Sequence, residues 1–461
     1  MLPRPARAVL CCAALLAGPP GTAVAQAPAP PAVRSIGPIT AVGAESLASV
    51  AAAVPVAGGR VYVNDILARR LLLFDSALTH ATVVADTSGE REAYGTTPGT
   101  LLSFHGDSAL FISPSSLAML VLTPGGTVAR VLAMPPSGRG IGALGLIGSI
   151  FGTPGFDARG RLVYYQPANV FIQGPARGGG ALNLQPPDSA LVVRFDLAAR
   201  TLDTIGAIRI PRTRTVMNRD DSGRPTGVTV TAIPAGPVDD WAVTSDGAIA
   251  IVRGRDYHVD WLGPDGAWTS TPRMAFGWER LDDGQKNALL DSMATALQVA
   301  MDSNFARQQR AMAGGPPGGG AGAAGGGGGP MIITMRVETG PPGGGGPPPG
   351  GASGGAAGPT TTRITVPRPT VVRAELSDAP DYRPPFGQGA VRADAEDRLW
   401  IRTSARVNGQ PVYDIVDRQG VVVDRVQLPP FRSVAGFGAG VVYLGVRDSV
   451  GVTRLERARL R

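Results

Sequence analysis

The sequence predicts an all-β protein, a six-bladed β-propeller with an inserted helix and a Gly/Pro-rich tether between blades four and five. Three observations lead to this prediction. Residues 240–271 form a unit of four short apolar runs joined by tight turns. Five other units place a similar turn before a short apolar run. One long segment rich in glycine and proline interrupts the series after the fourth unit.

The unit at 240–271 gives the clearest turn signals. Asp246-Gly247 and Asp265-Gly266 separate apolar, β-branched runs. Asp-Gly favours a tight hairpin because glycine adopts a positive φ without steric cost. The predicted strands are Trp241–Thr244, Ala248–Arg253, Tyr257–Leu262 and Ala267–Thr271. A single meander of this kind is marginal in water, so it needs copies of itself to stack on.

The other units repeat the turn between the first and second strands. These turns lie at 57–59, 105–107, 158–160, 396–398 and 438–440. The third unit is longer than the rest because residues 166–188 are inserted in it. A fixed series of such units is the sequence signature of a repeat architecture, and it predicts six stacked sheets.

The last unit has only three strands before the chain ends. A ring of blades must close, since closure removes sheet edges that would otherwise pair with other chains. Ile36–Val42 precedes the first unit, is apolar and is not otherwise assigned. We therefore expect this segment to pair with the sixth unit.

The pattern resembles the six-bladed β-propellers of the NHL and TolB-like kind. The resemblance lies in Val61–Asp75, Trp241–Gly266 and Val391–Gly420, and it extends over most of 36–275 and 376–461. It implies the architecture and says almost nothing about function, because propellers serve as binding modules, scaffolds, lyases and hydrolases alike.

Two insertions interrupt the blades of the predicted propeller domain at 36–461. Residues 211–237 contain two short strands and predict a protruding hairpin. Residues 279–375 begin with a predicted helix over 283–311. Asp282 and Gln285 form a capping box at its N-terminus. We expect its apolar face to pack on the propeller; the alternative is a surface for a partner or a membrane. Residues 313–358 hold 21 Gly and 8 Pro and predict a flexible tether.

The first 25 residues have the pattern of a cleaved signal peptide. Arg4 and Arg7 precede an apolar run, and Ala23-Val24-Ala25 fits a cleavage site. Residues 26–35 then predict a flexible leader. Cleavage removes both cysteines, Cys11 and Cys12, so the mature chain has no thiol chemistry. We expect a periplasmic or secreted protein.

Composition limits the partners. Without the predicted signal peptide, the chain contains 41 Lys and Arg and 36 Asp and Glu, and the arginines are scattered along the chain. Nucleic acid binding requires clustered cations, so we do not expect it. No other apolar run is long enough for a transmembrane span.

Catalytic and cofactor motifs are scarce. The three histidines, His80, His105 and His258, have no metal-ligand spacing, and no G-x-S-x-G or P-loop occurs. We therefore assign no catalytic, cofactor-binding or metal residues. Calcium is the one cofactor that the resemblance to propeller lactonases and related hydrolases suggests. The side chains that could offer oxygens to it are Asn64, Asp65, Asn169, Asn183, Asp239 and Asp240.

Two groups of residues predict contact with a ligand or partner, because aromatic and arginine side chains at blade ends are typical of binding surfaces. They are Arg253, Arg255, Asp256, Tyr257 and His258 in the fourth unit, and Tyr382, Arg383 and Phe386 where the chain returns from the tether. The alternative for Phe386 is packing between blades. The predicted function is a non-catalytic binding module for a protein, small molecule or glycan at the channel mouth. The alternative is a calcium-dependent hydrolase or lyase acting on a small ester, lactone or glycan.

Overall fold

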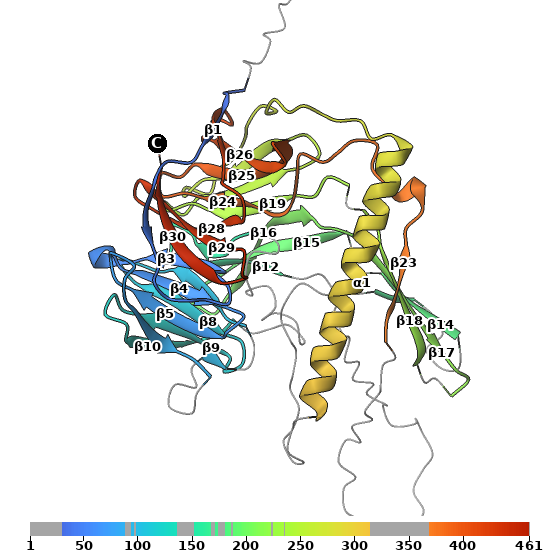
Figure 1. The fold of residues 1–461 in the computed structure, drawn as a ribbon, viewed down its shortest axis with the longest axis horizontal. Coiled ribbons are helices and arrows are strands. Elements are labelled where there is room, and N and C mark those ends of the chain that lie inside the picture. The colour runs from blue at the N-terminus through green and yellow to red at the C-terminus, as the bar shows by residue number, and fades with distance from the viewer. Residues whose placement is uncertain are drawn as a thin grey trace, which may run out of the picture.

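In the residues that it describes, the computed structural model of this chain contains seven β-sheets and one long helix (Figure 1). It describes residues 30–87, 94–95, 98–135, 152–166, 171–173, 180–185, 188–222, 225–234, 236–313 and 368–460. The predicted signal peptide, the leader through residue 29 and residues 314–367, which include the predicted tether from residue 314 on, lie outside the described residues.

Six of the sheets are the predicted blades. Blades one to three consist of β3 (Ala52–Pro55), β4 (Val61–Asp65), β5 (Arg70–Phe74) and β6 (Ala81–Ala85); β7 (Thr100–Ser103), β8 (Ala109–Ser113), β9 (Ala118–Leu122) and β10 (Val128–Ala133); and β11 (Gly155–Phe156), β12 (Leu162–Gln166), β15 (Ser189–Phe195) and β16 (Leu202–Arg209). Blades four to six consist of β19 (Asp240–Val243), β20 (Ile249–Arg253), β21 (His258–Leu262) and β22 (Trp268–Ser270); β24 (Phe386–Ala393), β25 (Leu399–Val407), β26 (Gln410–Val416) and β27 (Val422–Gln427); and β28 (Arg432–Gly438), β29 (Val441–Arg447) and β30 (Thr453–Arg459).

The Asp-Gly turns behave as their residues predict. Gly247 and Gly266 have φ of 82° and 86°. The Asp246 carboxylate accepts the Ala248 N–H at 3.1 Å, and the Asp265 carboxylate accepts the Ala267 N–H at 3.0 Å. These aspartates therefore serve their own turns, as short polar side chains commonly do.

The blades form a closed ring, because an apolar core lies between every two successive blades. Tyr62 of blade one packs with Phe111 of blade two, and Trp241 of blade four packs with Val192 of blade three. Four further clusters join blades two and three, four and five, five and six, and six and one. The last of these closes the circle, which confirms the six-bladed β-propeller.

Ring closure uses the N-terminal segment, as predicted. Strand β2 (Ile39–Val42) pairs antiparallel with β30 and completes blade six. Gly37, just before it, is required by close packing, since a Cβ there would lie 2.4 Å from the Arg459 carbonyl oxygen.

The predicted leader at 26–35 extends too far. Strand β1 (Val33–Ser35) pairs parallel with β27 of blade five. The Arg34 Nε donates to Asp424 at 2.8 Å, and Ile36 is buried beside Trp400. One continuous segment thus spans two blades, because an edge strand, an ion pair and an apolar contact hold it there.

The seventh sheet, here called the accessory sheet, was not predicted. Its order is β13-β14-β17-β18-β23: β13 (Phe171–Gln173), β14 (Gly180–Gln185), β17 (Thr213–Arg219), β18 (Pro225–Ala232) and β23 (Thr370–Arg373). The predicted hairpin is confirmed as β17 and β18. The insertion of blade three supplies β14, which pairs with β17, and the chain beyond the tether supplies β23, which pairs parallel with β18.

These insertions meet because they leave the ring at the same end. In a four-stranded antiparallel blade, the connection from the second to the third strand and the connection to the next blade lie at one end. We call this end the insertion face. The turns between first and second and between third and fourth strands lie at the opposite end, here called the turn face. Figure 1 shows the accessory sheet and helix standing beside the ring.

Helix α1 (Asp283–Ala313) begins with the predicted capping box: Gln285 N–H donates to Asp282 at 2.8 Å, and Asp282 N–H donates to Gln285 at 2.9 Å. Among the side chains described, its apolar residues pack on the accessory sheet and on the chain after β23. Leu297 and Met301 contact Met217, Val228, Val230 and Val371. The expectation of packing on the propeller was wrong because two insertions and β23 together create a closer apolar surface. Among the residues described, no helix is long and apolar enough to cross a membrane.

Candidate binding site

A pocket of about 510 Å³ opens on the insertion face beside blade four. It is lined by Gly236, Pro237, Arg255, Trp278, Pro380, Asp381 and Tyr382. Three connections supply these residues: the return from the hairpin, the turn between β20 and β21, and the two ends of the excursion that carries α1. Sites distant in sequence therefore converge on one pocket.

The two ends of that excursion hold each other in place. Arg280 and Tyr382 form an antiparallel bridge. The Leu281 N–H donates to the Asp381 carbonyl at 2.8 Å, and the Arg383 N–H donates to the Glu279 carbonyl at 2.9 Å. This short ladder places Trp278 and Tyr382 at the pocket, where they remain 40% and 47% exposed. Two aromatic faces are thus presented to solvent on a fixed backbone.

A chain of aromatic rings connects the pocket to the core. Trp278 packs edge-on against Phe276 at 5.6 Å between ring centroids, and Phe276 packs against Tyr257 at 5.6 Å. Tyr257 lies 6.0 Å from Phe386. Tyr257 and Phe386 are fully buried, so these two predicted contact residues support Trp278 from below and do not face solvent themselves.

Tyr257 also joins blades four and five. Its hydroxyl donates to the Asp414 carboxylate at 2.8 Å, and Arg425 Nε lies 3.0 Å from the other carboxylate oxygen. Burial, with the Asp414 charge next, raises the pKa of Tyr257 well above its usual value. Burial likewise raises the pKa of Asp414. Tyr257 is therefore a neutral donor that fixes the turn from which Arg255 projects.

Of the two charged side chains that line the pocket, Asp381 has an ion-pair partner and Arg255 has none among the described residues. Lys286 Nζ lies 2.6 Å from the Asp381 carboxylate and lowers its pKa. The exposed Arg255 side chain has no hydrogen bond or ion pair with any residue that the structure describes. A guanidinium offers five N–H donors and no acceptor. The pocket thus combines two aromatic faces with one cation, Arg255, that pairs with no described residue.

Other predicted contact residues are held by internal partners. Arg253 binds Asp239 at 3.0 Å and Asp260 at 2.7 Å. His258 lies 3.3 Å from Asp260, and Asp256 pairs with Arg273 at 3.3 Å. Arg383 pairs with Glu279 at 2.7 Å, which lowers the pKa of Glu279.

Of the eight predicted contact residues, Arg255 and Tyr382 alone line the pocket. Trp278 was missed by sequence reasoning. The signal in the sequence was a tryptophan between the last predicted strand of the fourth unit and the predicted helix.

The oxygens considered for calcium are engaged elsewhere. Asn64 Oδ1 accepts the Tyr94 hydroxyl at 2.6 Å, and Asp65 accepts the Ser49 N–H at 2.9 Å. Asp239 pairs with Arg253. Asn169 lies outside the described residues, and Asn183 is described only through its strand pairing in β14. Within the described parts of the chain no three His, Cys, Asp or Glu gather as metal ligands, so the members of this set whose side chains are described do not come together as a calcium site.

Asp240 is a buried acid on the inner strand of blade four. Its carboxylate accepts the Val391 N–H of blade five at 2.9 Å and the Trp241 N–H at 3.0 Å. Burial raises the pKa of Asp240 to about 7, although these N–H groups oppose the shift. Asp240 therefore joins two inner strands and titrates near neutral pH.

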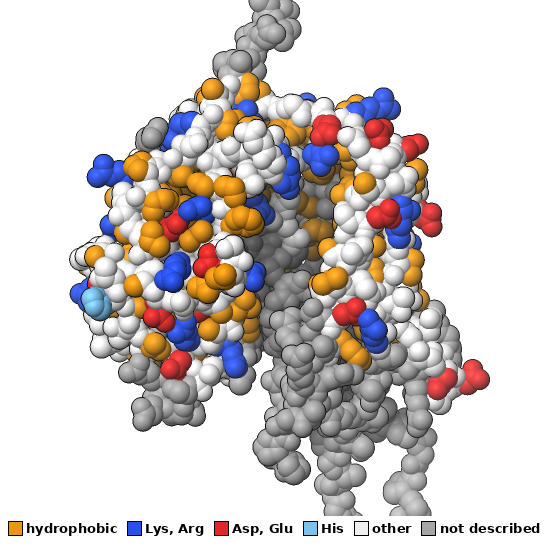
Figure 2. Space-filling model, in the orientation of Figure 1, with side chains coloured by type: hydrophobic (Ala, Val, Ile, Leu, Met, Phe, Trp, Pro, Cys, Tyr) orange, Lys and Arg blue, Asp and Glu red, His pale blue; other side chains and the backbone are white. Residues whose placement is uncertain are grey.

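Surface charge is mixed on the face that Figure 2 presents, where Lys, Arg, Asp and Glu side chains are interspersed over the ring and helix. A nucleic acid surface instead gathers cations along one stripe or face. This face of the described chain has no such pattern.

Comparisons with known proteins give structural neighbours alone. No protein-family model matches the sequence. No curated protein matches it either. Regucalcin from Agrobacterium tumefaciens str. C58, a calcium-binding protein, is similar at 10% identity and a TM-score of 0.35, over 93% of this chain and 98% of that one. A luciferin-regenerating enzyme has 9% identity, a TM-score of 0.31 and coverage of 89% and 92%. Virginiamycin B lyase from Staphylococcus aureus has 9% identity, a TM-score of 0.23 and coverage of 48% and 68%. The six-bladed assignment rests on the strand pairing and inter-blade cores of this chain.

Proposed function

We propose that this chain is an exported β-propeller of the NHL and TolB-like kind that acts as a binding module, with its ligand in the pocket formed by Arg255, Trp278 and Tyr382. The observation that carries the proposal is a guanidinium without a partner in the described part of the chain, beside two exposed aromatic faces in one pocket of about 510 Å³. That volume falls within the range of small-molecule sites, about 300–1,000 Å³.

The pocket chemistry favours a ring that bears a carboxylate. Trp278 and Tyr382 offer flat faces for a sugar or aromatic ring. Arg255 offers a forked donor that suits a carboxylate. Asp381 is paired with Lys286, so it does not repel an anion as a free acid would. A uronic-acid glycan and an aromatic carboxylate share this chemistry.

Tryptophan fluorescence and calorimetry test the proposal with oligogalacturonate and benzoate as the two probes. We expect saturable binding of at least one probe and a loss of roughly tenfold or more in affinity for Trp278→Ala and for Arg255→Met. Trp268→Ala is the matched control, since Trp268 is 47% exposed on β22 and does not line the pocket. Neither probe binding, or equal losses in the control, would contradict the proposal.

Export is tested on the protein recovered from its producing cell. We expect the mature chain to begin at Gln26, and N-terminal mass spectrometry measures this directly. A retained Met1 in the folded protein would contradict it.

The alternative function, a calcium-dependent hydrolase or lyase, is tested by metal analysis. Calcium bound in stoichiometric amount, with a melting temperature that falls after chelation, would favour the enzyme over the binding module.

A further inference from the structure

A second, smaller pocket lies on the turn face at the seam between blades three and four. Its volume is about 60 Å³. One wall comes from the turn between β11 and β12 together with Arg194 of β15, and the other from Ile249, Leu262 and the turn between β21 and β22. The space suits one small ion or group, and it lies at the opposite end of the ring from the pocket at Arg255.

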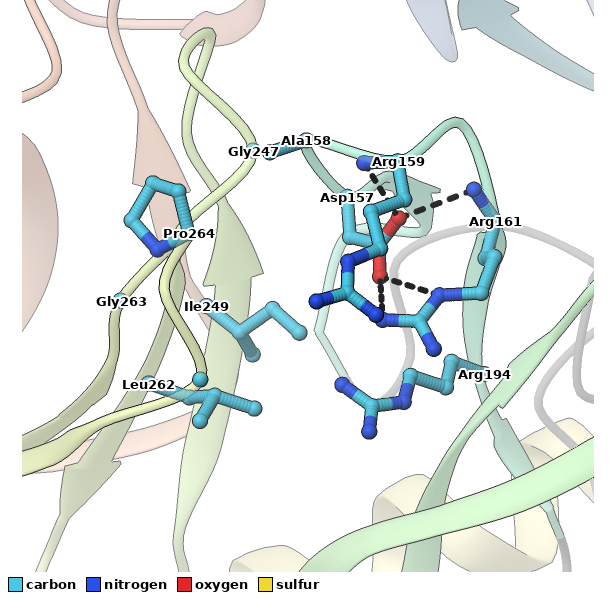
Figure 3. A pocket seen from close by; sticks show the side chains of 11 residues that line it. Asp157, Ala158, Arg159, Arg161, Arg194, Gly247, Ile249, Leu262, Gly263 and Pro264 are labelled. Atoms are coloured by element: carbon cyan, nitrogen blue, oxygen red, sulfur yellow. Dashed lines mark hydrogen bonds and ion pairs between the residues drawn. The ribbon is translucent and has the colours of Figure 1, made fainter.

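Three guanidinium groups gather at this pocket. Figure 3 shows the side chains of Arg159, Arg161 and Arg194 converging on one side, across from Ile249 and Leu262. Like charges in this arrangement repel one another, and the buried apolar residues opposite weaken solvent screening. An anion placed among the three groups would offset that repulsion.

Acidic groups in the pocket do not match the arginines. Asp157 is the one acid in the lining, and it accepts Arg161 Nε at 2.8 Å and the backbone N–H of Arg159 at 3.0 Å. Arg194 pairs at 2.7 Å with Asp203, which does not line the pocket. The Arg159 guanidinium has no ion pair or hydrogen bond to any described residue.

Donors also remain on the two paired arginines. Arg161 and Arg194 use Nε and Nη2 on their carboxylates. The Nη1 group of each has no partner among the residues described. All three guanidinium groups therefore keep N–H donors that no described residue accepts. Together these donors outnumber the hydrogen bonds that the two oxygens of one carboxylate can accept.

The pocket is built on a close contact between blades. A Cβ at Gly247 would lie 2.0 Å from the Ala158 backbone nitrogen, and Gly247 has φ of 82°. The turns of blades three and four thus approach as closely as glycine allows. This contact holds the arginine wall and the apolar wall at a fixed separation.

We propose that the seam pocket binds a tetrahedral oxyanion, phosphate or sulfate, free or as the end group of a monoester. Arg159 supplies the unneutralised charge, and Arg161 and Arg194 supply further forked donors. Guanidinium groups bind such anions through charge-assisted, paired hydrogen bonds.

The test measures binding of inorganic phosphate by calorimetry and by melting temperature, at constant ionic strength set with NaCl. We expect saturable binding, weaker binding of acetate, and a loss of roughly tenfold in phosphate affinity for Arg159→Met. Glycerol phosphate in a second arm distinguishes a monoester from the free ion, because only a monoester site gains affinity from the added group.

Arg255→Met is the matched control, because Arg255 is exposed, has no partner among the residues described and lies at the other end of the ring. We expect it to leave phosphate affinity unchanged, and Arg159→Met to leave binding of the ring carboxylate probes unchanged. A rise in melting temperature with phosphate that is no larger than the rise with NaCl would overturn the proposal. Phosphate binding that is lost in Arg255→Met and kept in Arg159→Met would overturn it as well. Either result leaves the proposed binding module to its own test.

Discussion

The ring and the accessory layer, meaning the accessory sheet with α1, are held together in different ways. Each seam of the ring is a core of fully buried side chains, such as Trp241 and Phe111. In the described part of the chain, the accessory layer has two small apolar clusters, one around Met301 and one around Leu290, together with polar contacts such as Val371 N–H to Gln298 at 2.9 Å. The ring therefore carries the stability, while the pocket at Arg255 lies where the weaker layer meets it.

The strongest test of this comparison is Trp241→Ala. Trp241 is fully buried between blades three and four, and its removal leaves a large cavity. We expect the free energy of unfolding to fall by about 3–5 kcal/mol, measured by urea denaturation. Trp268→Ala, at an exposed tryptophan, should change it by less than about 0.5 kcal/mol. Equal effects would mean that the seams do not dominate stability.

Met301→Ala tests the accessory layer. Met301 is buried against Met217 and Val230. We expect a loss of about 2–3 kcal/mol confined to this layer, because few neighbours surround the side chain. Hydrogen exchange should accelerate in β23 and remain slow in β20. Faster exchange in both strands would show that the layer and ring unfold together.

Tyr257→Phe tests the link between seam and pocket. The change keeps the ring that supports Phe276 and removes the hydroxyl that donates to buried Asp414. We expect the free energy of unfolding to fall by about 1–2 kcal/mol with little change in Trp278 fluorescence. Tyr382→Phe, at an exposed tyrosine, should leave stability unaltered. A large change in Trp278 fluorescence in Tyr257→Phe would contradict the supporting role assigned to the aromatic ring of residue 257.

Asp240 gives a pH dependence of the stability of the seam between blades four and five. Its pKa is about 7 in the folded protein against 3.8 for an ordinary aspartate, so between these values the folded state binds a proton that the unfolded state lacks. Stability from this group is complete below pH 3.8 and is lost as pH rises to 7, by at most about 1.4 kcal/mol per pH unit.

Asp240→Asn should flatten the dependence between pH 5 and 7 in urea denaturation. Asp246→Asn is the control, because the pKa of Asp246 is lowered and it does not titrate in this window. An unchanged slope in Asp240→Asn would show that Asp240 stays ionised in the folded protein.

The sequence was informative about the site only in part. Arg255 and Tyr382 were selected as aromatic and arginine residues at blade ends, and both line the pocket. Tyr257 and Phe386 were selected for the same reason and are buried. Local sequence cannot separate these cases, because the packing of Phe276 and Trp278 decides which ring faces solvent.

The blades, their closure and the helix start follow from the sequence by itself. Their signals are local: Asp-Gly turns, short apolar runs and a capping box act within a few residues. The accessory sheet, strand β1 and both pockets were decided by tertiary structure. They join segments as distant as Thr229 and Thr370, or Val33 and Arg425. Such pairings depend on which end of the ring each connection leaves from, and no local propensity records that.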